Sequence, residues 1–136
     1  MDLDAARSFL ADHHRAVLAT RRLDGSLQMS PVVCAVDRDD RIVVSTRETA
    51  AKAHNVIRDP AVSLCVLADT FFGEWIQLDG RGEVLHLPYV MEGLIDYYRS
   101  ISGEHDDWEA YRRAMITEQR VLLSITLERA GPDRRG

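Results

Sequence analysis

Short apolar segments alternate with tight turn signals through most of the chain up to Pro88, and this spacing constrains the fold more than any other feature. Antiparallel strands can be joined by two-residue turns, whereas a parallel pair needs a crossover of a dozen or more residues. The pair Asp24-Gly25 is such a turn signal. The apolar segments that it and similar turns separate are 16–20, 27–36, 41–46 and 61–69. We therefore predict a mainly β protein built from antiparallel hairpins.

A second Asp-Gly pair, Asp79-Gly80, lies inside the segment 74–87, which is predicted to form two strands around it. A last strand is expected over 120–128, and we expect a barrel of about six antiparallel strands. Helices are predicted where apolar residues recur with a period near 3.6 or where capping residues precede Ala-rich sequence. They cover residues 2 to about 13, a segment capped by Thr46 or Thr49 and stopped by Asp59-Pro60, and the segments 89–102 and 108–119. This pattern favours a β-barrel with flanking α-helices.

Pro31 interrupts the second predicted strand. Proline cannot donate a hydrogen bond to a β-ladder, so it is tolerated at a sheet edge or a bulge. We expect Pro31 to lie where the backbone is free to contact something other than a strand.

Length and composition fit one small globular domain. At 136 residues the chain suits a single core, predicted over 1–127, followed by a flexible C-terminal tail over 128–136. Its net charge of -5 argues against nucleic acid as a partner. The apolar runs are too short to span a membrane, and the acidic N-terminus does not resemble a signal peptide, so a cytoplasmic protein is expected. Cys34 and Cys65 are then expected to be free thiols rather than a disulfide or metal ligands.

The segment 45–55 carries the most specific chemical signal. A strand end bearing hydroxyl groups leads into a helix start with one lysine, Lys52, and backbone N–H groups at a helix start attract anions. A phosphate site is one interpretation. The alternative is an ordinary capped helix in which Glu48 pairs with Lys52 on a solvated face. Spacing alone favours the second interpretation.

Four stretches together resemble a known family. They are LATxxxDGxxQxSPV, STRETAAKAHNVIRDP, EWIQLDGRGEV and YRSISGEHDDWEAYRRAMITEQRVLL. Across almost the whole chain they resemble the deazaflavin-dependent split β-barrel reductases of the pyridoxamine 5′-phosphate oxidase-like, FMN-binding split-barrel superfamily. The resemblance implies a split β-barrel that forms a homodimer with the cofactor F420 between subunits. It further implies an oxidoreductase that transfers a hydride from reduced F420 to an electron-poor C=C bond or a related conjugated small molecule.

The same resemblance assigns residues to the cofactor. One group matches the strand beside the deazaflavin ring, a second matches the part that holds the ribityl chain and phosphate, and one aromatic matches the pocket wall. They are Gln28, Ser30, Pro31 and Val32; Ser45, Thr46, Arg47, Lys52 and Asn55; and Trp75. On this interpretation Lys52 holds a phosphate.

Two other functions stay open at this point. The protein could bind or carry F420 without turning over a substrate, or it could be an oxidase that uses FMN. No side chain is assigned as a catalytic acid, since a proton from solvent can complete the reduction. No metal site is predicted, because the acids around His105 are ordinary for a helix start, and the aromatic residues near it are interpreted as packing.

Overall fold

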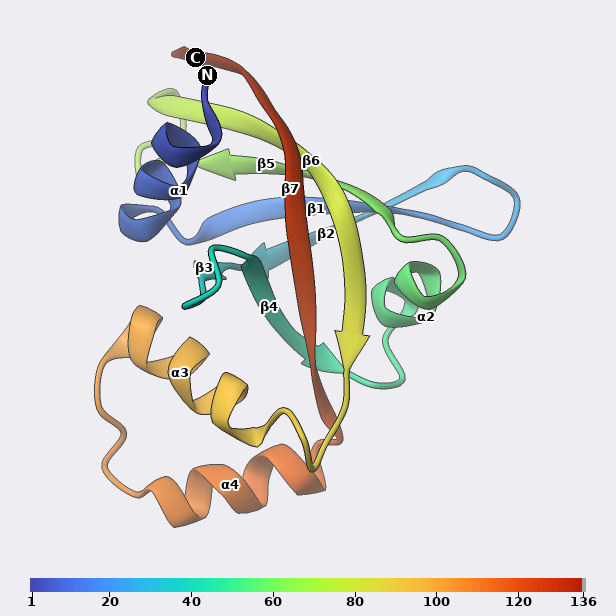
Figure 1. Ribbon diagram of the computed structural model, residues 1–136, viewed down its shortest axis with the longest axis vertical. Helices are drawn as coiled ribbons and strands as arrows, with labels where there is room; N and C mark the ends of the chain where they lie inside the picture. Colours follow the sequence, from blue (N-terminus) through green and yellow to red (C-terminus); the bar gives the residue numbers. More distant parts are fainter. Residues whose placement is uncertain (136) are drawn as a thin grey trace.

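The computed structural model describes residues 1–135 as one curled antiparallel sheet with four helices around it (Figure 1). The strand order across the sheet is β2-β1-β5-β6-β7-β4-β3. The strands are β1 (Arg15–Arg21), β2 (Leu27–Val33), β3 (Ala35–Val36), β4 (Ile42–Arg47), β5 (Ala61–Leu67), β6 (Glu74–Leu85) and β7 (Arg120–Arg135). The helices are α1 (Leu3–Asp12), α2 (Ala51–Arg58), α3 (Met91–Ser102) and α4 (Trp108–Thr117). The predicted split-barrel architecture is confirmed, with seven strands in the described residues where about six were expected.

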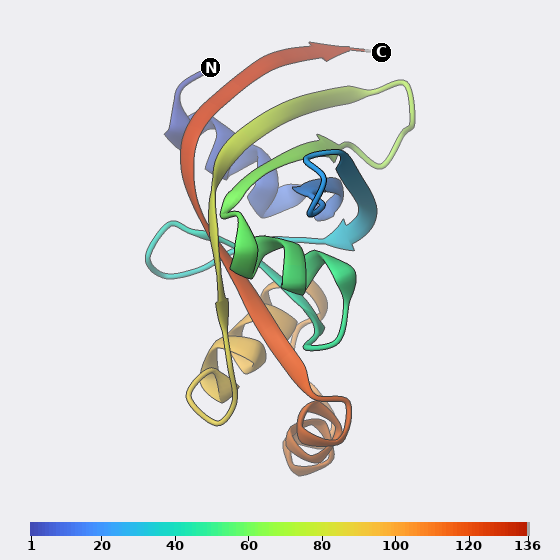
Figure 2. The same ribbon diagram turned by 90° about the vertical axis from the view of Figure 1, so that its right-hand side faces the viewer.

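The inner face of the curled sheet forms the main core. Alternate residues of the strands point inward, as the period of two along a strand requires, and they pack with one face of α1 and one face of α2. Leu10 of α1 and Val56 of α2 belong to this cluster, beside Leu64 of β5 and Leu123 of β7. Figure 2 shows the strands wrapping around this interior.

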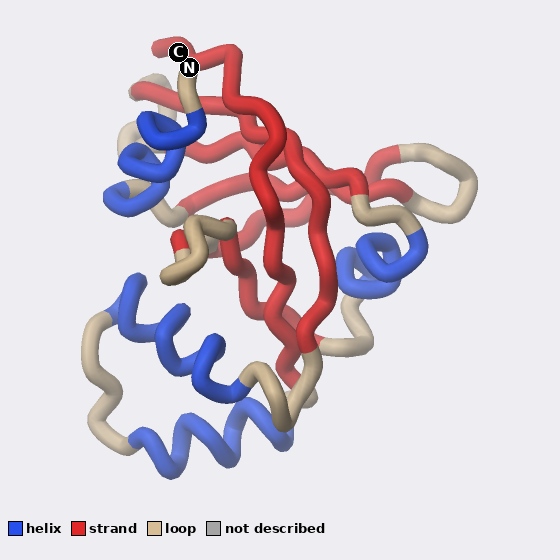
Figure 3. The backbone as a smooth tube through the Cα atoms, in the orientation of Figure 1, coloured by secondary structure: helices blue, strands red, loops and turns tan. Residues whose placement is uncertain are grey.

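A second, smaller core joins the α3–α4 hairpin to the outside of the barrel. Leu94 and Ile95 of α3 and Met115 of α4 pack against Val43 of β4 and Leu122 of β7. The tube view shows the hairpin as a unit below the sheet, connected to it through β6 and β7 (Figure 3). The molecule thus has two apolar clusters with a boundary between them.

Of the edge and the bulge that the sequence leaves open for Pro31, the structure has the edge. Pro31 lies in β2, an outer strand of the sheet, and pairs with Val17 of β1. The segment 27–36, predicted as one strand, is divided into β2 and the two-residue β3, which pairs with β4 instead of β1. The chain changes partner at Cys34, which is fully buried.

The prediction of two strands around Asp79-Gly80 is wrong, because β6 runs through this pair without a turn. The ladder between β6 and β7 has a register irregularity there. A Cβ atom on Gly80 would lie 2.4 Å from the carbonyl oxygen of Thr126 in β7, so only glycine allows the two backbones to approach this closely. The glycine serves strand packing, although it looks like a turn residue in the sequence.

Two boundary predictions are also wrong. Residues 128–136 were expected to form a flexible tail, but β7 continues to Arg135 and pairs with β6, where Glu74 is opposite Arg135; residue 136 lies outside the described part. The backbone ladder to β6 holds a segment whose Gly131-Pro132 pair suggests a break. The second helix is capped by neither Thr46 nor Thr49, since Thr46 pairs within β4 and the N-cap is Ala50, without a side-chain hydrogen bond.

No helix in the described part of the chain is long and apolar enough to cross a membrane.

Candidate functional site

A cavity of about 1040 Å³ lies between one edge of the barrel and the α3–α4 hairpin. Strands β1, β2 and β4 provide one wall, and α3 and α4 with the loop between them provide the opposite wall. The end of β5, the first turn of α2 and the start of β7 also contribute. Its lining is predominantly apolar. This is the composition expected of a site for an organic ligand, with a few polar groups to orient it.

Two of the four site residues predicted on the second strand line this cavity. Pro31 and Val32 are both in its wall, and Pro31 is exposed. Because a proline at an edge strand leaves no N–H to pair, the wall here is smooth and apolar. A flat ring system could pack against it.

Three more predicted residues meet at the junction between β4 and α2. Ser45 and Thr46 at the end of β4 and Lys52 in the first turn of α2 all line the cavity. Lys52 makes no hydrogen bond or ion pair with any side chain that the structure describes. The backbone N–H groups of Ala51 and Lys52 likewise have no partner among the described residues. The junction therefore offers an unpaired ammonium and free N–H donors beside two hydroxyl groups.

The alternative pairing of Glu48 with Lys52 is not present. Glu48 precedes α2, and its Oε1 atom lies 3.4 Å from Nδ1 of His86. The predicted pair would require α2 to begin at or before Glu48, so that Glu48 and Lys52 share one helical face. Instead β4 extends through Arg47, which pairs with Arg120 of β7, and the helix begins after it. Lys52 is thus left facing the cavity.

Further charges border the same end of the cavity. Arg120 donates to Oε1 of Glu118 from Nε at 3.0 Å and from Nη2 at 2.8 Å. Arg47 does not line the cavity but lies 3.7 Å from the same carboxylate oxygen. Among the described lining residues Glu118 has the only carboxylate, while Arg15, Lys52 and Arg120 are cationic. The cavity has more positive than negative side chains in a chain of net charge -5.

The remaining predicted residues lie outside the cavity lining. Asn55 is buried and its Nδ2 atom donates to Thr20 Oγ1 at 3.1 Å, while Arg58 donates to Asn55 Oδ1 at 2.8 Å. These bonds tie α2 to β1. Gln28 and Ser30 bond to each other at 2.7 Å.

Trp75 is at the start of β6, opposite the lining residue Leu67, without lining the cavity itself. A role for Arg47, Asn55, Gln28, Ser30 or Trp75 in cofactor binding stays a prediction.

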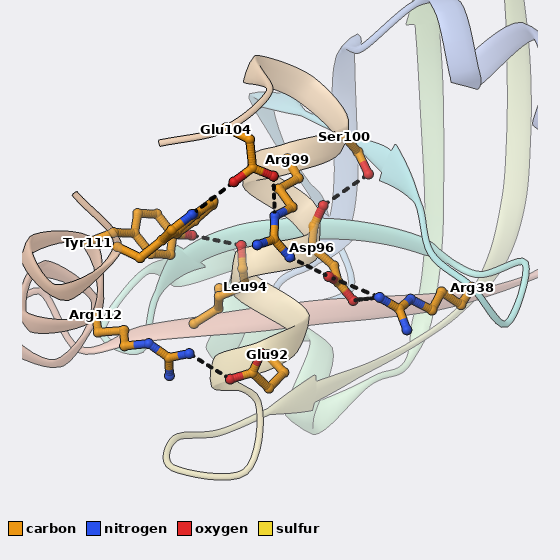
Figure 4. Close-up of polar contacts among 10 residues, drawn as sticks. Arg38, Glu92, Leu94, Asp96, Arg99, Ser100, Glu104, Tyr111 and Arg112 are labelled. Carbon is orange, nitrogen blue, oxygen red and sulfur yellow. Dashed lines mark hydrogen bonds and ion pairs between the residues drawn. The ribbon is translucent and has the colours of Figure 1, made fainter. Parts of the chain in front are cut away.

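The wall formed by α3 and α4 contains aromatic residues that sequence reasoning assigned to packing. Tyr97, Tyr98 and Tyr111 line the cavity together with His105 from the connecting loop. Tyr97 donates its hydroxyl to Val33 O at 2.7 Å, and burial raises its pKa. Tyr111 donates to Leu94 O at 2.7 Å, and burial raises its pKa to about 12 (Figure 4). Helical spacing alone gives no signal that these packed residues also face a cavity.

Outside this cavity the described residues show little reactive chemistry. Both cysteines are free, and burial raises the pKa of Cys34 to about 12, which holds it as a thiol. No group of three His, Cys, Asp or Glu side chains among the described residues could hold a metal ion.

Comparison with known proteins defines the class of this fold and site. The family model for pyridoxamine 5′-phosphate oxidase matches residues 3–131, so the chain belongs to that family. Members of this family bind flavins such as FMN, and the family includes oxidoreductases.

Three solved structures are similar over nearly the whole chain. A conserved hypothetical protein, Rv2991, from Mycobacterium tuberculosis has a TM-score of 0.74 at 25% identity, covering 96% of this chain and 82% of that one. An F420 reductase has a TM-score of 0.70 at 20% identity, covering 92% and 94%. HutZ, the heme storage protein from Vibrio cholerae, has a TM-score of 0.71 at 16% identity, covering 100% and 98%. The F420 reductase and the heme storage protein both share the fold of this chain, although they are named for different ligands.

Proposed function

We propose that the protein is an oxidoreductase that uses the deazaflavin cofactor F420 to reduce an electron-poor C=C bond or a related conjugated small molecule. The observation that carries the proposal is the unpaired Lys52 beside the free N–H groups of the α2 start, at the end of an apolar cavity. The family membership, the resemblance of the motifs and the F420 reductase among the similar structures support it.

The chain's own residues fit such a cofactor. Its phosphate would contact Lys52, the N–H groups of the first turn of α2 and the hydroxyls of Ser45 and Thr46. Its ring would lie against the apolar wall of Pro31 and Val32. Both parts line one cavity, which is the minimum that an amphiphilic cofactor with one apolar and one anionic end requires.

These contacts indicate which part of the reaction the cofactor would carry out and which part the protein would. Reduced F420, when bound, supplies a hydride, and the protein supplies binding, orientation and exclusion of water. Lys52, the hydroxyls and the N–H groups would fix the anionic end of the cofactor, and Pro31 and Val32 of β2 would restrict the movement of its ring. The apolar side chains of the α3–α4 wall, such as Met115 and Ala114, then leave an apolar space for a planar substrate.

A homodimer is part of the proposal. The outer face of the sheet carries exposed or partly exposed apolar side chains on β1 and β2, including Val17, Leu27 and Met29, where a second copy could pack. The cavity borders this face through Arg15, Val17 and Leu67. A partner could therefore complete the site. Light scattering at micromolar concentration tests this, and a monomer with full cofactor affinity would refute it.

Two alternatives use the same cavity. An FMN-dependent oxidase of the pyridoxamine 5′-phosphate oxidase type needs the same phosphate contacts, and a carrier of F420 needs no substrate space. The test is titration of the purified protein with F420, FMN and hemin, followed by oxidation of reduced F420 with a set of enones. We expect tight F420 binding, weaker FMN binding and turnover of at least one enone. Tighter binding of FMN than of F420 would mean that FMN is the cofactor. Tight F420 binding without turnover of any enone would favour a protein that carries F420.

A further inference from the structure

The loop between α3 and α4 places His105 in the wall of the cavity, opposite the strands of the barrel. The backbone N–H of Asp107 donates to Nδ1 of His105 at 2.9 Å. A nitrogen that accepts a hydrogen bond from an N–H cannot carry a proton itself. The ring in this structure is therefore the neutral form with its proton on Nε2. That N–H has no hydrogen-bond partner among the residues the structure describes.

Three aromatic rings hold the imidazole in place. The ring centroid of His105 lies 5.1 Å from that of Tyr98 and 5.6 Å from those of Trp108 and Tyr111. Tyr111 is itself fixed by its bond to Leu94 O. The orientation of the imidazole is therefore set before any ligand arrives.

The loop is in turn anchored from both helices. Glu104 accepts from Arg99 Nε at 2.8 Å and from Trp108 Nε1 at 3.0 Å, and Asp107 caps α4 by accepting from Ala110 N at 3.1 Å. Figure 4 shows the guanidinium of Arg99 beside the Glu104 carboxylate. The guanidinium of Arg99 also lies 4.8 Å from the centroid of the Trp108 ring. These contacts fix the loop on each side of His105.

We infer that the Nε2–H group of His105 donates a hydrogen bond to the carbonyl oxygen of the substrate. This rests on the proposed function and narrows its substrate class to α,β-unsaturated ketones and related carbonyl compounds with a planar apolar body. Reduced F420, when bound, would supply a hydride to the β-carbon: its own C–H bond would break, the cofactor would be oxidised by two electrons, and on the substrate one C–H bond would form as the C=C π bond breaks. The electron pair of that bond moves onto the α-carbon and the carbonyl oxygen, and a proton from water then completes the reduction.

His105 keeps its proton throughout this reaction. Loss of the proton from neutral imidazole would leave an imidazolate, and Nδ1 cannot take up a second proton without breaking its bond from Asp107 N. The ring thus acts as a fixed neutral donor toward the oxygen on which negative charge develops. It is a catalytic residue by contact with the reacting group.

An enolate mimic tests the inference independently of turnover. Para-nitrophenolate is a planar aromatic oxyanion whose absorption changes when its oxygen is hydrogen-bonded. We titrate it into the protein, alone and with saturating oxidised F420, for wild type, His105→Leu and His105→Gln. A charged hydrogen bond is worth about a ten- to hundredfold change in affinity. His105→Leu should lose this amount, while the glutamine amide, placed near the position of Nε2, should restore most of it.

The control is Tyr98→Phe, because Tyr98 lines the same wall and its hydroxyl has no hydrogen-bond partner among the described residues. A loss in Tyr98→Phe with no loss in His105→Leu assigns the donor to the hydroxyl and overturns the inference, as does absence of phenolate binding to wild type. In enone turnover, His105→Leu should lower kcat with the dissociation constant of F420 unchanged. If neither F420 nor FMN binds, the proposed function fails, and phenolate binding to the protein alone still decides the role of His105.

Discussion

Replacement of Lys52 by alanine separates a cofactor contact from a structural lysine. Lys52 lines the cavity and pairs with no described side chain, so the folded protein loses little when the ammonium is removed. A charge-assisted hydrogen bond to a phosphate contributes roughly 1.5 to 3 kcal/mol. Lys52→Ala should therefore raise the dissociation constant of F420 about ten- to a hundredfold, with the free energy of unfolding changed by less than about 0.5 kcal/mol.

The assay is a fluorescence titration with F420 beside urea unfolding of the same samples. Glu48→Ala is the matched control, because Glu48 is three residues before the helix and bonds to His86 outside the cavity. It should leave cofactor affinity unchanged. Lys52→Arg should retain most of the affinity, since it keeps the charge.

An unchanged affinity in Lys52→Ala would refute the reasoning. It would mean that the phosphate does not reach the α2 start, or that the N–H groups hold it without the lysine. The dependence of F420 affinity on salt concentration distinguishes the two cases. An affinity that still falls with ionic strength requires another cation at the cavity, such as Arg120. A large loss of stability in Lys52→Ala would instead show a structural role.

Three further predictions concern the fold and its ionisable groups. Gly80→Ala should destabilise the protein by about 3 kcal/mol in urea unfolding, since its Cβ would collide with backbone, whereas Gly82→Ala, whose nearest neighbour is a side-chain methyl at 3.1 Å, should cost less. The pKa of Asp79 is raised by burial but lowered overall by hydrogen bonds, so the stability advantage of wild type over Asp79→Asn should be full above about pH 5 and shrink as pH falls below 3.8; an advantage that does not change with pH would contradict this. With a thiol reagent at pH 8, Cys65 should react first: burial raises the pKa of both thiols, but Cys34 is fully buried with a pKa of about 12, whereas Cys65 is only half-buried; in Cys65→Ser the fast phase should vanish.

Much of the fold could be predicted because the hydrophobic pattern and the turn residues agree with each other. The Asp24-Gly25 turn between β1 and β2 follows from local sequence and is observed, and the edge position of Pro31 is one of those that the local sequence allows. Gly80 follows no local rule. Glycine is required there because the backbone of Thr126, 46 residues later in the chain, lies too close for any side chain. Such a contact between distant segments has no signature in a single sequence.

The candidate site could be predicted only in part for a related reason. Ser45, Thr46 and Lys52 are close in the sequence, so a local junction brings them together. His105 comes from a loop about fifty residues further on and reaches the same cavity only through the packing of α3 and α4. Asn55 is one turn beyond Lys52, yet Thr20 on β1 accepts its hydrogen bond and holds it away from the cavity.

The position of the cavity explains why its residues can be tested without unfolding the protein. The barrel interior and the α3–α4 hairpin each have an apolar cluster that forms without Lys52 or His105. The cavity lies where the two clusters meet, and neither the ammonium of Lys52 nor Nε2 of His105 has a hydrogen-bond partner among the described residues. Groups that keep unused hydrogen-bonding capacity at such a boundary stabilise a ligand more than they stabilise the fold. For this reason substitution of Lys52 should change binding and leave stability nearly unchanged. Substitution of His105, whose Nδ1 accepts from Asp107 N, or of Tyr111, which donates to Leu94 O from the second cluster, should affect both.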